Sequence, residues 1–335
     1  MASHPITTVS PVAADAQSST PATQVSLSRV GVTGVEKVIR VEANGSGDLY
    51  HADFECFVDL EPRQAGVHMS RFEEVVGEAI DEVVLGETFR AEILAAHIAQ
   101  RVRERQGGLR AEVAVTARYP ETVTTPASGL PTQEIYVLFG TAVDSPRGTR
   151  TLTGVQAQGM TACPCAQEMV GGLARERLAE RGFDAAQIEL AIDAVPVATH
   201  NQRGIGTLHI GCPEGGPAWI DAPELLRIVE QSMSSEIYGL MKRPDELAVV
   251  EKAHSQPRFV EDCVREMVRR VVEDYPDLPG EAFVMARQEN LETIHRHNVV
   301  AERYGSLDDL RAELASGEHQ RRHVTVREWL EAPGA

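Results

Sequence analysis

The sequence predicts an α+β protein in which antiparallel strands form the sheet and helices pack on one of its faces. Stretches in which apolar and polar residues alternate come in neighbouring pairs, and stretches with apolar residues at helical spacing separate these pairs. The order of strand pair, helices and strand pair occurs roughly twice along the chain, although no repeat is visible residue by residue. Strand pairs with helices on one face are the natural layering for such a pattern.

Composition and charge narrow the functional classes. The 335 residues fit one large domain or two ordinary ones, and a hydrophobic content of 42% suffices for a core. A net charge of -18 with only 5% aromatic residues argues against a nucleic-acid partner. The lack of a long apolar run or a secretory signal pattern argues against a membrane partner. The five cysteines show no disulfide spacing, so we expect a cytoplasmic protein with free thiols.

The chain begins with a polar segment. Residues 1–28 are rich in Ser, Thr, Ala, Pro and Gln, a composition typical of a disordered tail. Strands are expected at 36–41 and 51–60, with the turn sequence Asn44-Gly45-Ser46-Gly47 between them.

Helices and more strands follow in this half. Ser70, with Glu73 three positions later, forms a capping-box pattern, so a helix is expected to start there. A second helix is expected over 87–105. Further strands are expected at 110–118, 132–144 and 150–160.

The second half shows similar patterns. Pro244 disfavours helix at the residue before it, so the segment 242–246 is expected to end a long helix. We expect a first module at 29–182 and a second at 183–330. The expected strands lie at 206–211 and 281–288, and the expected helices at 169–181, 184–191, 223–240, 258–274 and 307–315.

The segment Thr161-Ala162-Cys163-Pro164-Cys165 concentrates two of the five thiols at the end of an expected strand. A lone cysteine is usually a small buried hydrophobe, but two thiols at a strand end favour function. Spacing alone does not decide whether Cys163 or Cys165 would bind a metal. The remaining cysteines have apolar or glycine-rich neighbours and are expected in the core.

Imidazole and carboxylate groups lie further along the chain. His200 is in the polar run 199–203, whose many donors are typical of a pocket that orients a polar ligand. Glu292 and His295 have the Glu-x-x-His spacing that places both on one face of a helical turn, a recognised metal-site arrangement. The segment follows a strand, so an irregular turn is the alternative. Thiolate, imidazole and carboxylate from distant segments together favour a transition-metal site.

The positions of some other charged residues are explained by secondary structure alone. Glu246 lies in a charged segment between helices, and Glu261 in a first helical turn is explained by the helix dipole. His68 and Arg71 open a helix, where an anion can bind.

Six motifs in one order resemble the type IB GTP cyclohydrolase family over roughly residues 34–305. The resemblance implies the tunnelling fold, built from two similar α+β modules in one chain. It also implies opening of the guanine imidazole ring of GTP, with release of formate and formation of 7,8-dihydroneopterin triphosphate for folate or pterin biosynthesis. The motifs are Gly66–Phe72, Met160–Cys165, Thr199–Gly204, Leu240–Glu246, Phe259–Asp262 and Glu289–His295.

The resemblance also implies a divalent metal and its ligands. Cys163, His200 and Glu246 would bind the metal, with His295 at or near it and Glu292 supporting that shell. Fe(II), Mn(II) and Zn(II) all tolerate such ligands.

Substrate-binding and proton-transfer roles follow from the same motifs. Glu261 would accept hydrogen bonds from the guanine edge, because a carboxylate suits its two donors. His295 or His297 would transfer protons, since imidazole titrates near working pH. The implied triphosphate contacts are Arg71, Arg203, Lys242 and Arg243.

One departure bears on the product. The segment between Cys165 and His200 is longer than in the compact bacterial enzymes and resembles the archaeal branch of the family. That branch uses ferrous iron and releases a cyclic phosphate of dihydroneopterin. Such folds bury half-barrels against symmetric partners, so we expect a homodimer or homotetramer.

Two other functions stay open at this level. A nitrile reductase of the 7-deazaguanine pathway would use a cysteine, a glutamate and NADPH, and would leave the His200 and His295 segments without a role. A structural zinc protein would close its site with four protein ligands, whereas mixed ligands favour an open position.

Overall fold

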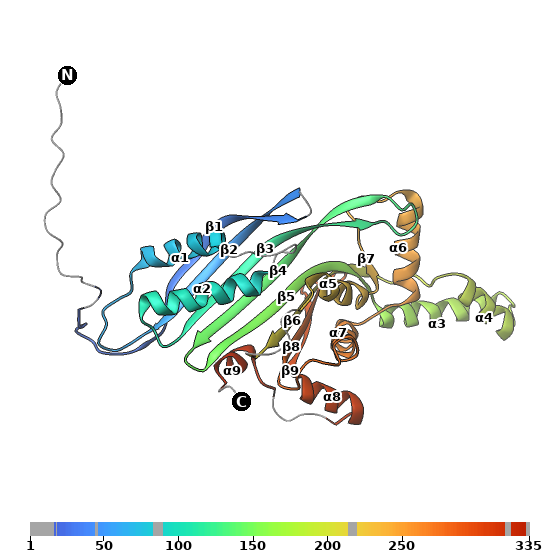
Figure 1. Ribbon diagram of the computed structural model, residues 1–335. Coiled ribbons are helices and arrows are strands. Elements are labelled where there is room, and N and C mark those ends of the chain that lie inside the picture. The colour runs from blue at the N-terminus through green and yellow to red at the C-terminus, as the bar shows by residue number, and fades with distance from the viewer. Residues whose placement is uncertain are drawn as a thin grey trace, which may run out of the picture.

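The computed structural model describes residues 17, 19–43, 46–82, 90–213, 220–318 and 323–332. In this part of the chain one nine-stranded sheet runs in the order β1-β2-β3-β4-β5-β6-β8-β9, with the short β7 beside β5 (Figure 1). All neighbouring strands are antiparallel. The strands are β1 (Leu27–Ala43), β2 (Ser46–Leu60), β3 (Ala111–Thr124), β4 (Pro131–Ser145), β5 (Gly148–Ala162), β6 (Asn201–Cys212), β7 (Ser235–Glu236), β8 (Phe283–Leu291) and β9 (Val299–Ser306).

Helices α1, α2, α5 and α7 cover one face of this sheet. Helices α1 and α2 lie over the first strands, whereas α5 and α7 lie over β5, β6, β8 and β9 (Figure 1). The helices are α1 (Met69–Glu82), α2 (Ala91–Gln106), α3 (Pro164–Glu180), α4 (Ala185–Ala194), α5 (Ala222–Gln231), α6 (Arg243–Ser255), α7 (Val260–Asp274), α8 (Leu307–Ser316) and α9 (Val326–Glu331).

The main core lies between the sheet and these helices. Phe54 on β2, Phe72 on α1 and Leu94 on α2 are fully buried. Helix α2 approaches the sheet so closely that a Cβ added to Gly140 would lie 2.2 Å from the carbonyl carbon of Ala91. The α+β layering predicted from the alternation of strand residues is confirmed, because the main core lies between one face of the sheet and these helices.

A smaller core lies on the opposite face. Trp329 on α9 packs against Phe283, with ring centroids 5.7 Å apart, and both are buried together with Leu152. The C-terminal helix α9, which the sequence patterns do not predict, therefore covers part of the second face.

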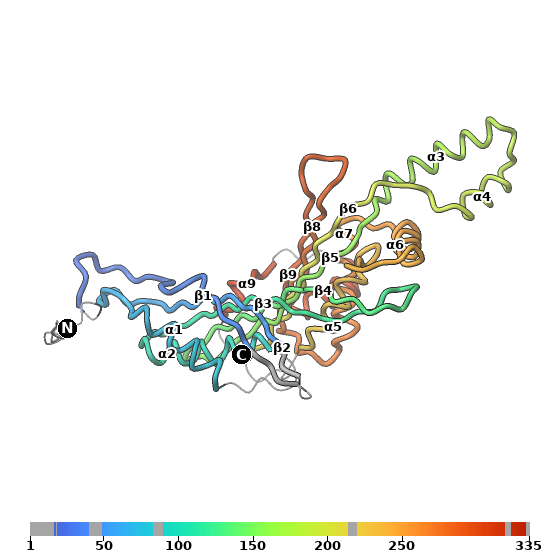
Figure 2. The backbone as a smooth tube through the Cα atoms, turned by 90° about the horizontal axis from the view of Figure 1, so that it is seen from above, coloured from blue at the N-terminus to red at the C-terminus, as the bar shows by residue number. Residues whose placement is uncertain are grey.

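Figure 2 shows that α3 and α4 form a hairpin extending away from the sheet, on the same side of the molecule as the turn between β8 and β9. Asp184 caps α4, since its carboxylate accepts from the N–H of Gln187 (2.8 Å) in a capping box. The hairpin corresponds to the long segment between Cys165 and His200.

Several predicted boundaries are wrong. Ser70 lies inside α1, which already starts at Met69, so it does not cap the helix. The helix expected over 223–240 ends at Gln231, where the Ser232 hydroxyl donates to the carbonyl oxygen of Ile228 (2.7 Å). Serine competes in this way for helical carbonyl groups, and the chain then enters β7.

The segment 242–246 starts a helix instead of ending one. Pro244 lies in the first turn of α6, where its missing N–H costs nothing. Strand β9, also absent from the prediction, lies at the sheet edge and fully buries only Gly305, so it lacks the alternation of an inner strand.

Some predictions fall outside the described residues. The expected tail at 1–28 does so for the most part, and the described portion shows β1 starting at Leu27. The turn expected at 44–47 and the helix start expected at 87 also lie partly outside it. The division at residue 182 stays a prediction. Among the described helices, none combines the length and apolar character that crossing a bilayer requires.

Candidate active site

The candidate site lies where β5 ends beside the start of β6. The ladder pairs Ala162 with Asn201, and one step further the N–H of Cys163 donates to the carbonyl oxygen of His200 (3.1 Å). The Thr199 hydroxyl donates to the Cys163 carbonyl oxygen (2.7 Å) and closes this corner. Opposed residues in an antiparallel ladder carry neighbouring side chains, so the thiol and the imidazole belong to one site.

Cys163 is also the N-cap of α3. Its sulfur accepts from the N–H of Ala166 (3.5 Å), and Pro164 occupies the first helical position. The sulfur thus lies at the positive end of the helix dipole, a position suited to an anionic metal ligand. Cys165, by contrast, is exposed on α3.

Two acceptors lie beside the His200 ring. Its Nδ1 atom is 3.0 Å from Oε1 of Gln202 and 3.9 Å from Oε2 of Glu292. The Glu292 side chain follows β8 directly and is only 7% exposed. One edge of the imidazole therefore faces groups from β6 and from the turn after β8.

The segment 292–298 forms an irregular turn between β8 and β9, so the Glu-x-x-His spacing does not lie on a helix. The Thr293 hydroxyl donates to the carbonyl oxygen of Asn201 (3.1 Å), which ties this turn to the start of β6. His295 and His297 stack with ring centroids 5.2 Å apart. The turn thereby holds two exposed imidazoles beside His200.

The segment that leads into α7, together with its first turn, forms another wall of the candidate site. The N–H of Arg258 donates to the carbonyl oxygen of Ala162 (3.0 Å), and its guanidinium donates to the carbonyl oxygen of Ser232 (3.0 Å). Glu261 lies in the first turn of α7. These contacts place a cation and a carboxylate next to the end of β5.

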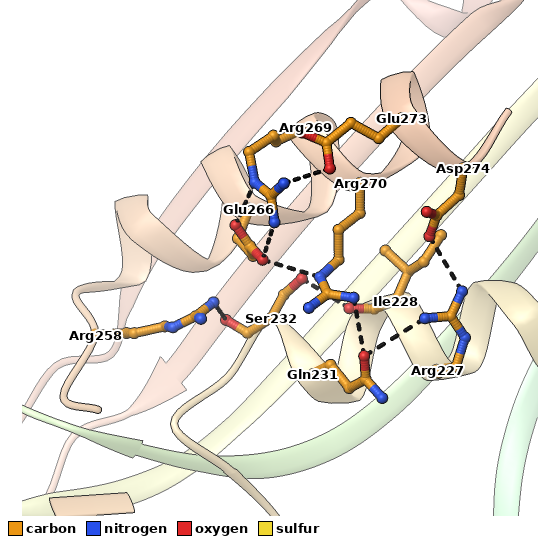
Figure 3. A network of polar contacts seen from close by, with 10 residues as sticks. All are labelled: Arg227, Ile228, Gln231, Ser232, Arg258, Glu266, Arg269, Arg270, Glu273 and Asp274. Atoms are coloured by element: carbon orange, nitrogen blue, oxygen red, sulfur yellow. Dashed lines mark hydrogen bonds and ion pairs between the residues drawn. The ribbon is translucent and has the colours of Figure 1, made fainter. Parts of the chain in front are cut away.

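A network of polar contacts fixes α7 on α5 (Figure 3). Arg269 and Arg270 both donate to Glu266, and Arg270 also donates to Gln231 on α5 (2.9 Å). Hydrogen bonds from Arg269 lower the pKa of Glu266 to about 2. The network keeps the N-terminal end of α7, with Arg258 and Glu261, in a fixed position over the strands.

Side chains from the ends of the strands, the turn after β8 and the start of α7 line a pocket of ≈ 440 Å³. Its volume is in the range of small-molecule sites. Arg258 and Asn290 also line it, and neither is among the expected site residues, although Arg258 directly precedes one motif and Asn290 lies within another. The expected site residues that the pocket brings together are Cys163, His200, Glu261, Glu292, His295 and His297.

The other expected site residues do not line this pocket. Arg71 is on α1, where it donates to the carbonyl oxygen of Arg105 (3.0 Å). Arg203 follows Gln202 on β6, so its side chain points to the opposite face of the sheet. The remaining three lie at the exposed start of α6: Lys242, Arg243 and Glu246.

Helix α6 leads away from the pocket. Its last turn lies next to α3, since Gln167 donates to the carbonyl oxygen of His254 (2.7 Å). Glu246 precedes His254 by eight residues, which corresponds to about 12 Å along the helix axis. Within one chain, Glu246 therefore lies apart from Cys163 and His200.

The donor set suits a divalent metal, but one chain does not assemble a complete shell. Thiolate and imidazole from Cys163 and His200 fit zinc or another transition metal. Within the described part of the chain, no three His, Cys, Asp or Glu side chains come together in a way that could hold an ion. A complete shell needs a further ligand.

Comparison with known proteins identifies the family of this chain. The family model for type I GTP cyclohydrolase folE2 matches residues 13–301. GTP cyclohydrolase MptA of Methanocaldococcus jannaschii is 40% identical over 310 residues, covering 91% of this chain and 98% of that protein. GTP cyclohydrolase MptA of Methanococcus maripaludis is 41% identical over 308 residues, covering 90% of this chain and 97% of that protein.

A solved structure confirms the tunnelling fold. Uricase from Arthrobacter globiformis matches with a TM-score of 0.50 and 9% sequence identity, over 90% of this chain and 98% of that one. This likeness concerns the fold alone, whereas the sequence matches concern the family. The chain belongs to the type I GTP cyclohydrolase folE2 family, as its motifs predict.

Proposed function

We propose that this protein is a metal-dependent GTP cyclohydrolase that opens the guanine imidazole ring hydrolytically and releases formate. One observation carries the proposal. Cys163, His200, Glu261 and His295, which come from four distant segments, line one pocket of small-molecule size. A thiol and an imidazole can hold a divalent metal, while a carboxylate can bind a purine and a second imidazole can transfer protons.

Each residue has a role in this proposal. Glu261 accepts hydrogen bonds from the N1–H and amino donors of guanine and so orients the ring. Arg258, the cation in the pocket wall, neutralises negative charge on the bound nucleotide. His295 or His297 donates and accepts protons as the carbon–nitrogen bonds of the ring break.

A divalent cation held by Cys163 and His200 would supply Lewis acidity for the attack of water at C8 of guanine. Glu246 is the third ligand that the family resemblance implies, but it lies apart from this pair in its own chain. We propose that it reaches the site of a second copy in a homodimer or homotetramer. The exposed position of Lys242 and Arg243 beside it suits contacts with the triphosphate of that same site.

The proposed reaction has two candidate products. The family resemblance implies 7,8-dihydroneopterin triphosphate. A cyclic phosphate of dihydroneopterin is the second candidate, because the α3–α4 hairpin fills the segment that resembles the archaeal branch, and relatives from archaea are 40% identical.

Anaerobic incubation of the purified protein with GTP and Fe(II), Mn(II) or Zn(II) tests the proposal. Formate release and product mass are read together. The triphosphate would support the first product, and a cyclic phosphate would support the second. A folded sample that releases no formate with any of the three metals would refute the cyclohydrolase proposal.

A further inference from the structure

Gln202 occupies a buried position beneath His200 that the proposed reaction does not yet explain. It lies on β6 directly opposite Thr161 on β5, and both side chains are buried, at 5% and 0% exposure. Nε2 of Gln202 donates to the Thr161 hydroxyl (3.0 Å), and Oε1 lies 3.0 Å from Nδ1 of His200. A buried amide thus connects the interior of the sheet to the imidazole.

This contact decides which ring nitrogen carries the proton. An amide oxygen can only accept, so Nδ1 of His200 must donate to it. A reversed amide would direct an N–H group at Nδ1, but Oε2 of Glu292 lies 3.9 Å from the same nitrogen and is also an acceptor. Two acceptors on one side favour the Nδ1–H form, which leaves the lone pair of Nε2 free.

We infer that Gln202 is a positioning residue: with Thr161 behind it, it holds His200 in the tautomer whose Nε2 can bind a divalent cation. The inference rests on the metal site of the proposed function, but not on the identity of the substrate. Gln202 itself does not touch the metal or the nucleotide in this account. Thr161 acts one step further out, by fixing the direction of the amide.

The same two strands provide a matched control. Nε2 of Gln156 on β5 donates to the hydroxyl of Thr207 on β6 (3.2 Å), and these residues are also direct neighbours in the ladder. This pair has the same Gln–Thr hydrogen bond but lies five residues along each strand from the Thr161–Gln202 pair, away from His200. Thr207→Val therefore measures the cost of losing such a bond without altering the imidazole.

The experiment measures Co(II) binding to metal-free protein through its visible absorption, which reports the ligand geometry. Gln202→Met removes the acceptor, and we expect its Kd for Co(II) to rise about 10- to 100-fold, as for other residues that orient a metal-binding histidine. Thr161→Val should weaken binding in the same direction, Thr161→Ser should restore it, and Thr207→Val should leave it unchanged. Circular dichroism checks that each variant is folded.

A second measurement reads the tautomer directly in the wild-type protein and uses a variant only for signal assignment. Nitrogen-15 NMR of the metal-free protein, with His200 assigned from a His200→Ala sample, should show the Nδ1–H tautomer. An Nε2–H tautomer, or an unchanged Kd in folded Gln202→Met, would overturn the inference, as would a folded wild type that binds no Co(II). If the wild type binds Co(II) with this pattern but releases no formate from GTP, the inference stands and the proposed function fails.

Discussion

The two thiols one residue apart have different surroundings. Cys163 opposes His200 in the ladder and lines the pocket, whereas Cys165 is exposed on α3. We predict that Cys163→Ala loses the bound metal and at least about 100-fold in kcat/KM, more than the loss of an orienting residue. Cys165→Ala should keep both the bound metal and the kcat/KM of the wild type. Metal analysis, turnover and circular dichroism of the two variants check this.

The opposite ranking of the two variants would assign the metal to Cys165. Loss of the fold in Cys163→Ala would indicate a structural metal instead of a catalytic one. Spacing alone could not choose between the thiols, because the choice depends on where α3 starts. Arg258 was missed for a similar reason: its position depends on a hydrogen bond to Ala162, nearly a hundred residues earlier in the chain.

Glu230 on α5 makes stability depend on pH. Burial raises its pKa to about 7, although it accepts a hydrogen bond from the hydroxyl of Tyr136 (2.7 Å). The folded pKa exceeds the ordinary value of 4.5, so the folded state binds more protons between these pH values. Its contribution to stability is therefore present below about pH 4.5 and is lost as the pH rises through about 7.

The variant Glu230→Gln keeps the acceptor but cannot ionise. Between pH 5 and pH 8, we expect the free energy of unfolding to fall by up to about 3 kcal/mol more in the wild type than in the variant. Urea unfolding at both pH values measures the difference. Parallel pH profiles for the two proteins would show that Glu230 ionises freely in the folded state.

At the scale of elements, Asp245 anchors the start of α6. Its carboxylate accepts from the N–H groups of Ala127 (2.9 Å), Ser128 (2.7 Å) and Lys242 (2.9 Å), and from the Ser128 hydroxyl (2.6 Å). Burial alone would raise the pKa of Asp245, but these hydrogen bonds hold it well below its usual range. The anchor fixes α6 against the turn between β3 and β4.

Breaking this anchor should misplace the cations at the start of α6. We predict that Asp245→Ala lowers kcat/KM for GTP by about 10- to 100-fold, because small shifts of positioning groups are costly. Ser128→Ala removes one hydrogen bond of the set and should have a smaller effect. Steady-state kinetics of both variants test this prediction. A folded Asp245→Ala variant with the kcat/KM of the wild type would show that the start of α6 does not contribute to substrate binding.

The same helix shows which elements the sequence could predict. Local periodicity predicts that α5 and α7 exist, because an apolar stripe repeats along each. It fails at 242–246, where Pro244 can either end a helix or begin one. The carboxylate of Asp245 decides between the two through a turn more than a hundred residues earlier, and that contact leaves no local pattern.

For the molecule as a whole, layering could be predicted and the complete site could not. Strand alternation is a local property, and it correctly gives an antiparallel sheet with helices on one face. Cys163 and His200 meet because neighbouring strands pair. Glu246 is different, since its distance from them depends on the direction in which α6 runs. The order of the motifs along the sequence does not predict that direction.

Exposed apolar side chains on α3, on α6 and in the turn after β8 suit contact with a second copy of the chain. Met169 and Leu173 on α3, Leu247 and Val250 on α6, and Ile294 in the turn after β8 are apolar and exposed, Met169 by 65% and Leu247 by 66%. Large apolar side chains exposed on neighbouring elements are typical of an interaction surface. Glu246 lies on α6 directly before Leu247, so an interface there would also bring in this carboxylate.

Mixing two inactive variants tests this arrangement. Cys163→Ala and Glu246→Ala should each be inactive alone. If Glu246 acts on the site of a partner, a mixed dimer contains one intact site, made of Cys163 from one chain and Glu246 from the other. Random mixing of a symmetric dimer then restores about a quarter of the wild-type activity.

The matched control mixes Cys163→Ala with His200→Ala, whose residues share one pocket within a chain. Every site in that mixture lacks one ligand, so no activity should return. Light scattering during size-exclusion chromatography checks that both mixtures assemble alike. Restoration in the first mixture alone places Glu246 in the partner's site, whereas an inactive first mixture means that Glu246 either serves its own chain, after a movement of α6, or is not a ligand.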